Sequence, residues 1–164
     1  QGGRKPWTAP LAAAVRDGRL ERSREVTRQA RPDAARSYLS DGTGLAWHVP
    51  SALRSHGTFV LDAEIPRPVR STLVRRYGVD DPDTFAERWT RAEALAKLAD
   101  LPIITWLSRH GLTVPEHVGA LRDVGETDWS TERFGDVIVT FAVTAHAQRA
   151  DTSEERSPAV GGTV

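Results

Sequence analysis

The absence of cysteine constrains the fold of this chain more than any other feature of its sequence. Without cysteine there are no disulfide bonds, no thiolate nucleophiles and no cysteine-based zinc sites. The chain has 164 residues, of which 39% are hydrophobic. It is therefore the size of one ordinary domain and can bury roughly two-thirds of its unfolded surface. The packing of a single core must hold the fold together.

Helix signals recur along the chain. Capping boxes, in which a threonine is followed three residues later by glutamate, open two of the expected helices, and glycines close two others. On one of these helices the pairs Glu87–Arg91 and Glu93–Lys97 have the spacing of exposed ion pairs on an outer face. We expect helices over residues 10–17, 19–30, 69–77, 84–99, 100–110 and 113–123.

A small sheet is predicted in the first half of the chain. Residues 36–39 and 45–49 flank a glycine-rich turn, which suits an antiparallel hairpin. A third strand is expected over residues 58–65, where apolar residues alternate with Asp62 and Glu64. This alternation predicts that one face of the strand is buried and that both carboxylates lie on the exposed face.

The last apolar segment, residues 130–148, has two interpretations. Phe134, Ile138 and Phe141 fit one face of a helix, whereas the branched residues between them favour a strand. The length of the segment favours a helix. The predicted fold is therefore α+β and helix-dominated, with about six helices and an antiparallel sheet of two or three strands in the first half. We expect one globular domain over residues 1–148 and a flexible tail over residues 149–164.

Charge is sorted along the chain although the net charge is +0. Residues 1–76 hold 14 Arg and Lys against 7 Asp and Glu, and residues 77–164 hold 8 against 15. A GC-rich coding sequence explains why arginine outnumbers lysine, but it does not explain where the acids lie. The sorting predicts a basic first half and an acidic second half, and a basic surface attracts anionic partners.

The basic half is the main functional candidate. Guanidinium groups bind phosphates as bidentate donors, and a hairpin beside a basic helix resembles the shape of winged-helix DNA readers. We therefore expect a non-enzymatic regulatory or interaction protein that binds nucleic acid, DNA in particular. The alternative for the same residues is a solvated face with local ion pairs. The arginines assigned to this interface are Arg19, Arg22, Arg24, Arg28, Arg31, Arg36, Arg70, Arg75 and Arg76.

Metal binding and catalysis have weaker support in the sequence. The five histidines, His48, His56, His110, His117 and His146, have no HExxH spacing, and the acids Asp80, Asp81 and Asp83 suit a helix N-terminus. We expect no metal and no cofactor. No P-loop, Gly-x-Ser-x-Gly or kinase motif is present. The remaining enzymatic alternative places His48 beside Asp62 or Glu64 on the sheet, as a general acid/base pair.

Partners and location follow from the same observations. Nucleic acid is the first expected partner, and a protein partner or a second copy, joined through the basic and acidic ends, is the alternative. No apolar run reaches the ~20 residues of a membrane helix, so we expect a soluble, cytoplasmic protein without membrane contact. The chain begins at Gln1 and has no signal-peptide pattern, as expected for a trimmed product, a processed product or a fragment.

Overall fold

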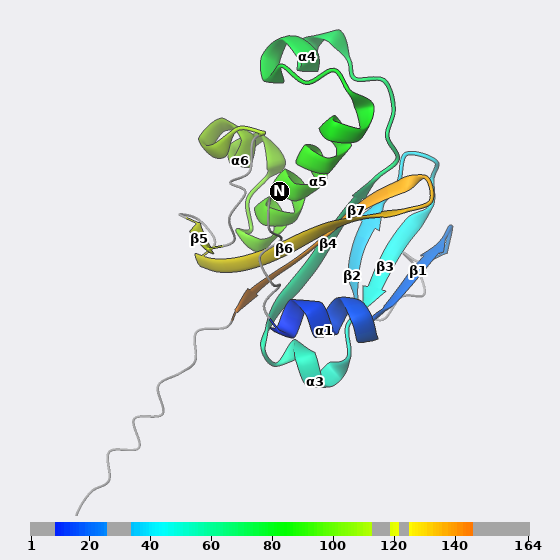
Figure 1. The fold of residues 1–164 in the computed structure, drawn as a ribbon, viewed down its shortest axis with the longest axis vertical. Helices are drawn as coiled ribbons and strands as arrows, with labels where there is room; N and C mark the ends of the chain where they lie inside the picture. Colours follow the sequence, from blue (N-terminus) through cyan, green and yellow to red (C-terminus); the bar gives the residue numbers. More distant parts are fainter. Residues whose placement is uncertain (1–8, 26–33, 113–118, 122–124, 146–164) are drawn as a thin grey trace, which may run out of the picture.

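The computed structural model describes residues 9–25, 34–112, 119–121 and 125–145, and helices and strands share this part of the chain (Figure 1). Among the helices described, none combines the length and apolar character that a transmembrane helix needs. The elements are, in order, α1 (Ala9–Asp17), β1 (Arg19–Ser23), β2 (Ala35–Tyr38), β3 (Gly44–His48), α3 (Ser51–Arg54), β4 (Gly57–Glu64), α4 (Ser71–Tyr77), α5 (Pro82–Leu98), α6 (Ile103–His110), β5 (Gly119–Leu121), β6 (Gly125–Phe134) and β7 (Val137–Ala145).

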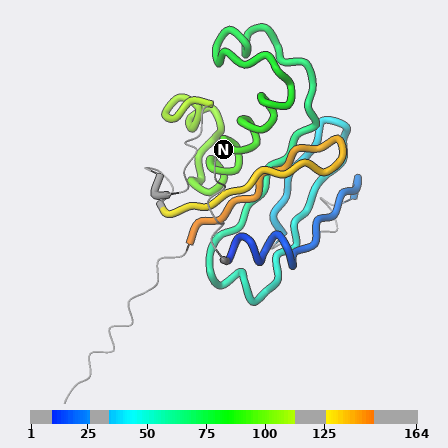
Figure 2. Tube along the Cα trace, in the orientation of Figure 1, coloured from blue at the N-terminus to red at the C-terminus, as the bar shows by residue number. Residues whose placement is uncertain are grey.

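The strands form two antiparallel sheets, with the orders β1-β3-β2 and β4-β7-β6-β5. The predicted hairpin is confirmed, because β2 pairs with β3. The helix-dominated fold with one sheet in the first half is wrong. β4 does not extend the hairpin but pairs with β7, in a second sheet formed mostly by the later part of the chain (Figure 2).

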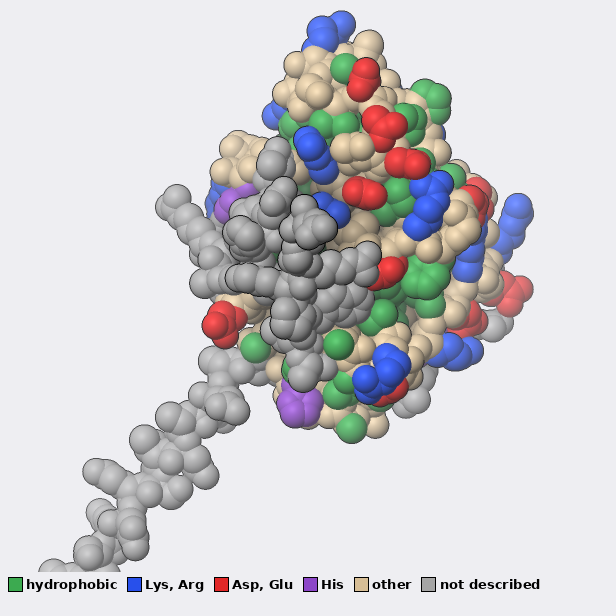
Figure 3. Space-filling view, in the orientation of Figure 1, with side chains coloured by type: hydrophobic (Ala, Val, Ile, Leu, Met, Phe, Trp, Pro, Cys, Tyr) green, Lys and Arg blue, Asp and Glu red, His purple; other side chains and the backbone are tan. Residues whose placement is uncertain are grey.

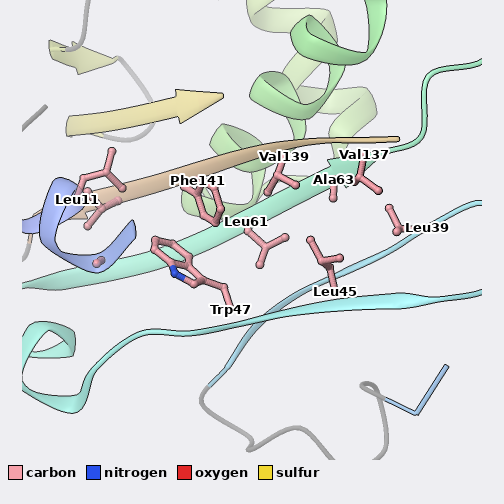
Figure 4. Packing of buried hydrophobic residues seen from close by; sticks show 11 residues of the cluster. Leu11, Leu39, Leu45, Trp47, Leu61, Ala63, Val137, Val139 and Phe141 are labelled. Atoms are coloured by element: carbon pink, nitrogen blue, oxygen red, sulfur yellow. The ribbon is translucent and has the colours of Figure 1, made fainter. Parts of the chain in front are cut away.

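The main core lies between the two sheets, and α1 covers one end of it (Figure 1). Trp47 extends from β3 towards Phe141 of β7, and their ring centroids are 4.8 Å apart in an edge-to-face arrangement (Figure 4). Leu45 lies beside it on β3, and Leu61 and Ala63 face the same core from β4. Burial of the alternating apolar residues of β4 confirms the strand predicted over residues 58–65.

The segment expected to be a helix over residues 130–148 is instead the hairpin of β6 and β7. Every residue of β7 from Val137 to Val143 is buried, because one face meets the sheet of β3 and the other meets α5. A strand covered on both faces shows a continuous apolar run without alternation. For this reason the periodicity of the segment was ambiguous and its length was misleading.

The helix expected over residues 19–30 is also wrong, because residues 19–23 form β1 along the edge of β3. Gly18 makes this turn possible. A Cβ atom at Gly18 would lie 2.3 Å from the carbonyl oxygen of Ala14 and 2.6 Å from Trp47 Nε1. Only a residue without a side chain fits between the end of α1 and the Trp47 ring. Residues 26–30 lie outside the described part of the chain.

α5 packs on the β4-β7-β6 sheet, on the face opposite the main core, and α6 packs against α5 (Figure 1). The helix predicted over residues 84–99 is confirmed, although Asp81 rather than Thr84 is its N-cap. Pro102 is the N-cap of α6 in place of Asp100. The helix expected over residues 113–123 lies mostly outside the described residues, and residues 119–121 form β5.

Candidate nucleic-acid interface

The arginines of β1 are paired with acids of the same chain. Arg19 lies 3.3 Å from Glu21. Arg22 contacts Asp41 at 2.9 Å and Asp136 at 2.7 Å, so an acid from the second half neutralises an arginine from the first. Hydrogen bonds from Thr43, together with Arg22, lower the pKa of Asp41 to about 2. These guanidinium groups are already engaged by carboxylates.

The other arginines of the first group do not join into one surface with α4. Arg24 is exposed at the end of β1, and Arg36 is half-buried on β2. Arg28 and Arg31 lie outside the described residues. β1 and α4 lie well apart (Figures 1 and 2). The structure therefore separates the predicted interface into two groups.

The second group of arginines gathers at the α4 end of the molecule. Arg70 is the N-cap residue of α4, and Arg75 and Arg76 occupy its last turn, before Gly78 ends the helix in the left-handed conformation (φ 69°). All three are exposed, and within the described ranges none of them forms an ion pair. Basic side chains are visible at this end in Figure 3. These arginines are available to a partner.

Arg67 belongs to the same surface although the sequence analysis did not select it. It lies between Pro66 and Pro68, which exclude helix and keep the chain extended between β4 and α4. Its side chain is exposed. We define the α4 arginine group as Arg67, Arg70, Arg75 and Arg76.

A pocket of about 310 Å³ lies beside this group. One wall is the segment 64–70 with Leu73 of α4, and the other is the first half of α5. On α5, Phe85 and Trp89 stack with their ring centroids 5.6 Å apart and an interplanar angle of 20°. The N-cap bond from the Thr84 amide to Asp81, 2.7 Å long, fixes the start of this helix. Pocket and arginines therefore form one continuous candidate site.

Glu64 is the carboxylate in the lining of this pocket. It is half-buried at the end of β4. Burial raises the pKa of Glu64, the nearby charge of Asp62 adds to this rise, and Arg67 opposes it. The pocket thus combines aromatic walls, cationic groups and one partly desolvated carboxyl.

Behind the pocket, α5 meets the sheet through a buried charge. Asp62 was predicted to be exposed, but its exposed fraction is 2%. The Lys97 ammonium lies 2.7 Å from Asp62 Oδ1, and Ser37 Oγ donates to the same oxygen at 3.1 Å. The expectation of an outward Glu93–Lys97 pair is therefore wrong for Lys97, which binds the sheet. By contrast, the Glu87–Arg91 pair is present at 3.6 Å.

The carboxyls of Asp62 and Glu93 are close enough for the charge of Asp62 to disfavour ionisation of Glu93. Burial, followed by the charge of Asp62, raises the pKa of Glu93 to about 8. Burial also raises the pKa of Asp62, and Lys97 opposes that rise. The pair therefore holds one proton near neutral pH.

The predicted His48 site does not assemble. His48 Nε2 lies 3.1 Å from Glu21 Oε2 on the neighbouring β1, while Asp62 binds Lys97 and Ser37. A search of the described residues finds no group of three or more side chains placed to hold a metal ion. Of the three acids at the start of α5, Asp81 serves as the N-cap and Asp83 binds Arg133 at 2.8 Å. His117 and His146 lie outside the described residues.

Comparison with protein-family models, curated proteins and solved structures finds no match to this chain. The functional assignment therefore depends on the geometry of the site. The sequence analysis selected Arg70, Arg75 and Arg76 as site residues but not Phe85 and Trp89, which line the pocket and also pack against the apolar cluster of α5 and α6. The sequence held one signal for this site: two aromatic residues spaced four apart, so on one face of a helix, soon after a cluster of arginines that begins between two prolines.

Proposed function

We propose that this protein is a non-enzymatic nucleic-acid-binding protein and that its interface is the α4 end. The observation that carries the proposal is the α4 arginine group, four exposed guanidinium groups within ten residues. They form no ion pair with any other residue that the structure describes. Guanidinium forks match phosphate oxygens, and several of them along one surface suit a polyanion.

The aromatic pocket beside the arginines favours a nucleic acid over other polyanions. Proteins that bind single strands combine a cationic track with aromatic side chains on which bases stack. Phe85 and Trp89 supply such side chains next to Arg67 and Arg70. A regulatory role in the cytoplasm, with DNA as the first ligand to test, completes the proposal.

The test compares two variants with the same loss of charge. In one, Arg70, Arg75 and Arg76 are changed to Gln; in the control, Arg16, Arg19 and Arg24 are changed to Gln. Binding of a fluorescently labelled oligonucleotide is measured by anisotropy from about 50 to 200 mM salt. For four phosphate contacts we expect a log–log slope of about −3 in the unmodified protein, equivalent to a loss of about 50-fold over this range.

The α4 variant should lose most of the affinity, and its salt slope should fall by about one for each arginine removed. The control should bind almost as the unmodified protein does, because Arg16 and Arg19 are already paired with Asp17 and Glu21. Absence of binding at about 50 mM salt would refute the proposed function, since phosphate contacts are strongest there. An equal loss in both variants would refute the location at α4.

A further inference from the structure

We infer that the pocket between residues 64–73 and α5 accepts one unstacked base of a single strand, and that Glu64 selects bases with an exocyclic amino group. This inference rests on the proposed function and deepens it. The pocket volume of about 310 Å³ lies at the lower end of the range of small-ligand sites, about 300–1,000 Å³. A site of this size suits one planar ring.

The walls of the pocket suit a planar aromatic ligand. Trp89 and Phe85 form one side, and Ile65, Val69 and Leu73 contribute apolar side chains on the other. A base stacks on an aromatic side chain irrespective of its sequence, because every base has a π-face. In a duplex the bases are stacked and paired, so only an unstacked base can enter.

The arginines lie where the backbone of such a strand would continue. Arg67 and Arg70 line the same pocket as the aromatic pair. Arg75 and Arg76 follow along α4. A base in the pocket would therefore place its own phosphate near Arg67 or Arg70 and a neighbouring phosphate near the last turn of α4.

Glu64 gives the pocket a means of discrimination. A carboxylate accepts hydrogen bonds from an amino group such as the N4 amine of cytosine. Thymine has two carbonyl oxygens on either side of its single ring N–H, and these repel a carboxylate. The half-buried position of Glu64 strengthens both effects, because water competes less there. We therefore expect cytosine to be preferred over thymine.

The experiment measures anisotropy for labelled oligo-dC, oligo-dT and a mixed-sequence duplex of equal length with the unmodified protein. Oligo-dC should bind about tenfold more tightly than oligo-dT, and the duplex should bind least tightly. Glu64→Gln should bring oligo-dC and oligo-dT to similar affinities, because an amide can either donate or accept. This variant changes no charge in the arginine group.

Trp89→Leu provides a second readout, with thermal unfolding as the check on its fold. Single-strand affinity should fall about tenfold, while duplex affinity and its salt slope stay unchanged. Equal binding of oligo-dC and oligo-dT, with Trp89→Leu without effect, would overturn the inference but leave binding at the arginines intact. If the unmodified protein binds no oligonucleotide at all, the proposed function itself would be overturned.

A free nucleotide carries the same ring and phosphate as a strand. Cytidine 5′-monophosphate should displace oligo-dC only at concentrations well above the Kd of the oligonucleotide, because it reaches only one or two arginines. Displacement at concentrations comparable to that Kd would overturn the assignment to a strand and indicate a nucleotide site.

Discussion

At the scale of single residues, the most unusual feature is the carboxyl pair of the buried Asp62 and the half-buried Glu93. Two neighbouring carboxyls that are shielded from water cannot both be ionised at low cost, so one of them retains a proton. Lys97 stabilises charge on Asp62, and burial raises the pKa of Glu93 to about 8. Glu93 is therefore the member that carries the proton, although it lies on a helix rich in ordinary exposed charges.

This proton makes the stability of the protein depend on pH. The pKa of Glu93 rises from 4.5 to about 8 on folding, so between these values the folded state binds more protons than the unfolded chain. The free energy of unfolding should therefore fall as pH rises through this window and become level above it. The raised pKa values of Asp62 and Glu64 act in the same direction.

Glu93→Gln tests this dependence, because glutamine resembles the protonated side chain. Urea unfolding gives the free energy of unfolding at about pH 5 and about pH 8. Its decrease between these values in Glu93→Gln should be about half, or less, of the decrease in the unmodified protein. The variant should be the more stable protein at about pH 8. Glu87→Gln, on the same helix and paired with Arg91 at the surface, should leave the profile unchanged. An unchanged profile in Glu93→Gln would disprove the raised pKa of Glu93.

At the scale of elements, α5 is held between two unlike surfaces. Towards α6 it presents Ala92, Leu95 and Ala96 in an apolar cluster. Towards the sheet it presents polar groups: Thr90 Oγ1 lies 2.8 Å from Thr140 Oγ1 of β7, in a buried hydrogen bond. Directional polar contacts of this kind fix the rotation of a helix more narrowly than apolar packing does. They therefore position the pocket-lining face of α5.

Lys97 is a charged attachment of α5 to the sheet. Its ammonium contacts Asp62 Oδ1 at 2.7 Å, the Leu61 carbonyl oxygen at 2.9 Å and the Arg36 carbonyl oxygen at 3.5 Å. It thus joins α5 to strands of both sheets. The three donors of an ammonium group suit this arrangement.

Lys97→Met should lower the free energy of unfolding by about 2 kcal/mol, because it leaves the buried Asp62 without its cation. This loss of stability is smaller than that expected for a fully buried ion pair, because 38% of the Lys97 side chain is exposed. Chemical denaturation checks this value. In the double variant Asp62→Asn with Lys97→Met, the loss should be smaller than the sum of the two single losses. Strict additivity would argue against the pairing.

The elements differ in how well their sequences predicted them. The β2–β3 hairpin, β4, α4 and α5 carry local signals, namely turn residues, alternation, a closing glycine and caps. β1 and β7 lack such signals. β1 is a strand because it pairs with the edge of β3. Just before it, the chain leaves α1 at Gly18, which lies in close contact with Trp47. In β1 a helical prediction loses to tertiary contact, whereas in β7 the branched residues favoured the observed strand and the length of the segment misled the prediction.

At the scale of the whole molecule, acidic and basic groups are more evenly mixed in space than they are along the sequence. Arg22 of the first half pairs with Asp136 of the second, and Lys97 of the second pairs with Asp62 of the first. Acidic and basic side chains are intermixed on the described part of the face in Figure 3. Strong attraction between the two ends of separate copies is therefore not expected.

Sedimentation velocity checks this consequence. The sedimentation coefficient should be the same at about 50 and about 500 mM salt, because short-range pairs within one chain leave little field beyond the Debye length, which is about 14 Å at the lower salt and about 4 Å at the higher. A species at low salt that dissociates at high salt would support the self-association alternative instead. Repeating the run with the Arg70, Arg75 and Arg76 to Gln variant would show whether the α4 group is responsible.

By itself the sequence determined the features that depend on neighbouring residues: the hairpin turn, the alternation of apolar residues in β4, the C-terminal end of α4 and the body of α5. The tertiary structure decided which faces are covered, and so it made residues 125–145 a hairpin and buried Asp62 beneath α5. Burial on a second face depends on elements distant in sequence, and no local pattern records it. The arrangement of distant elements also separates the arginines of β1 from those of α4, and it forms the pocket beside the α4 arginine group.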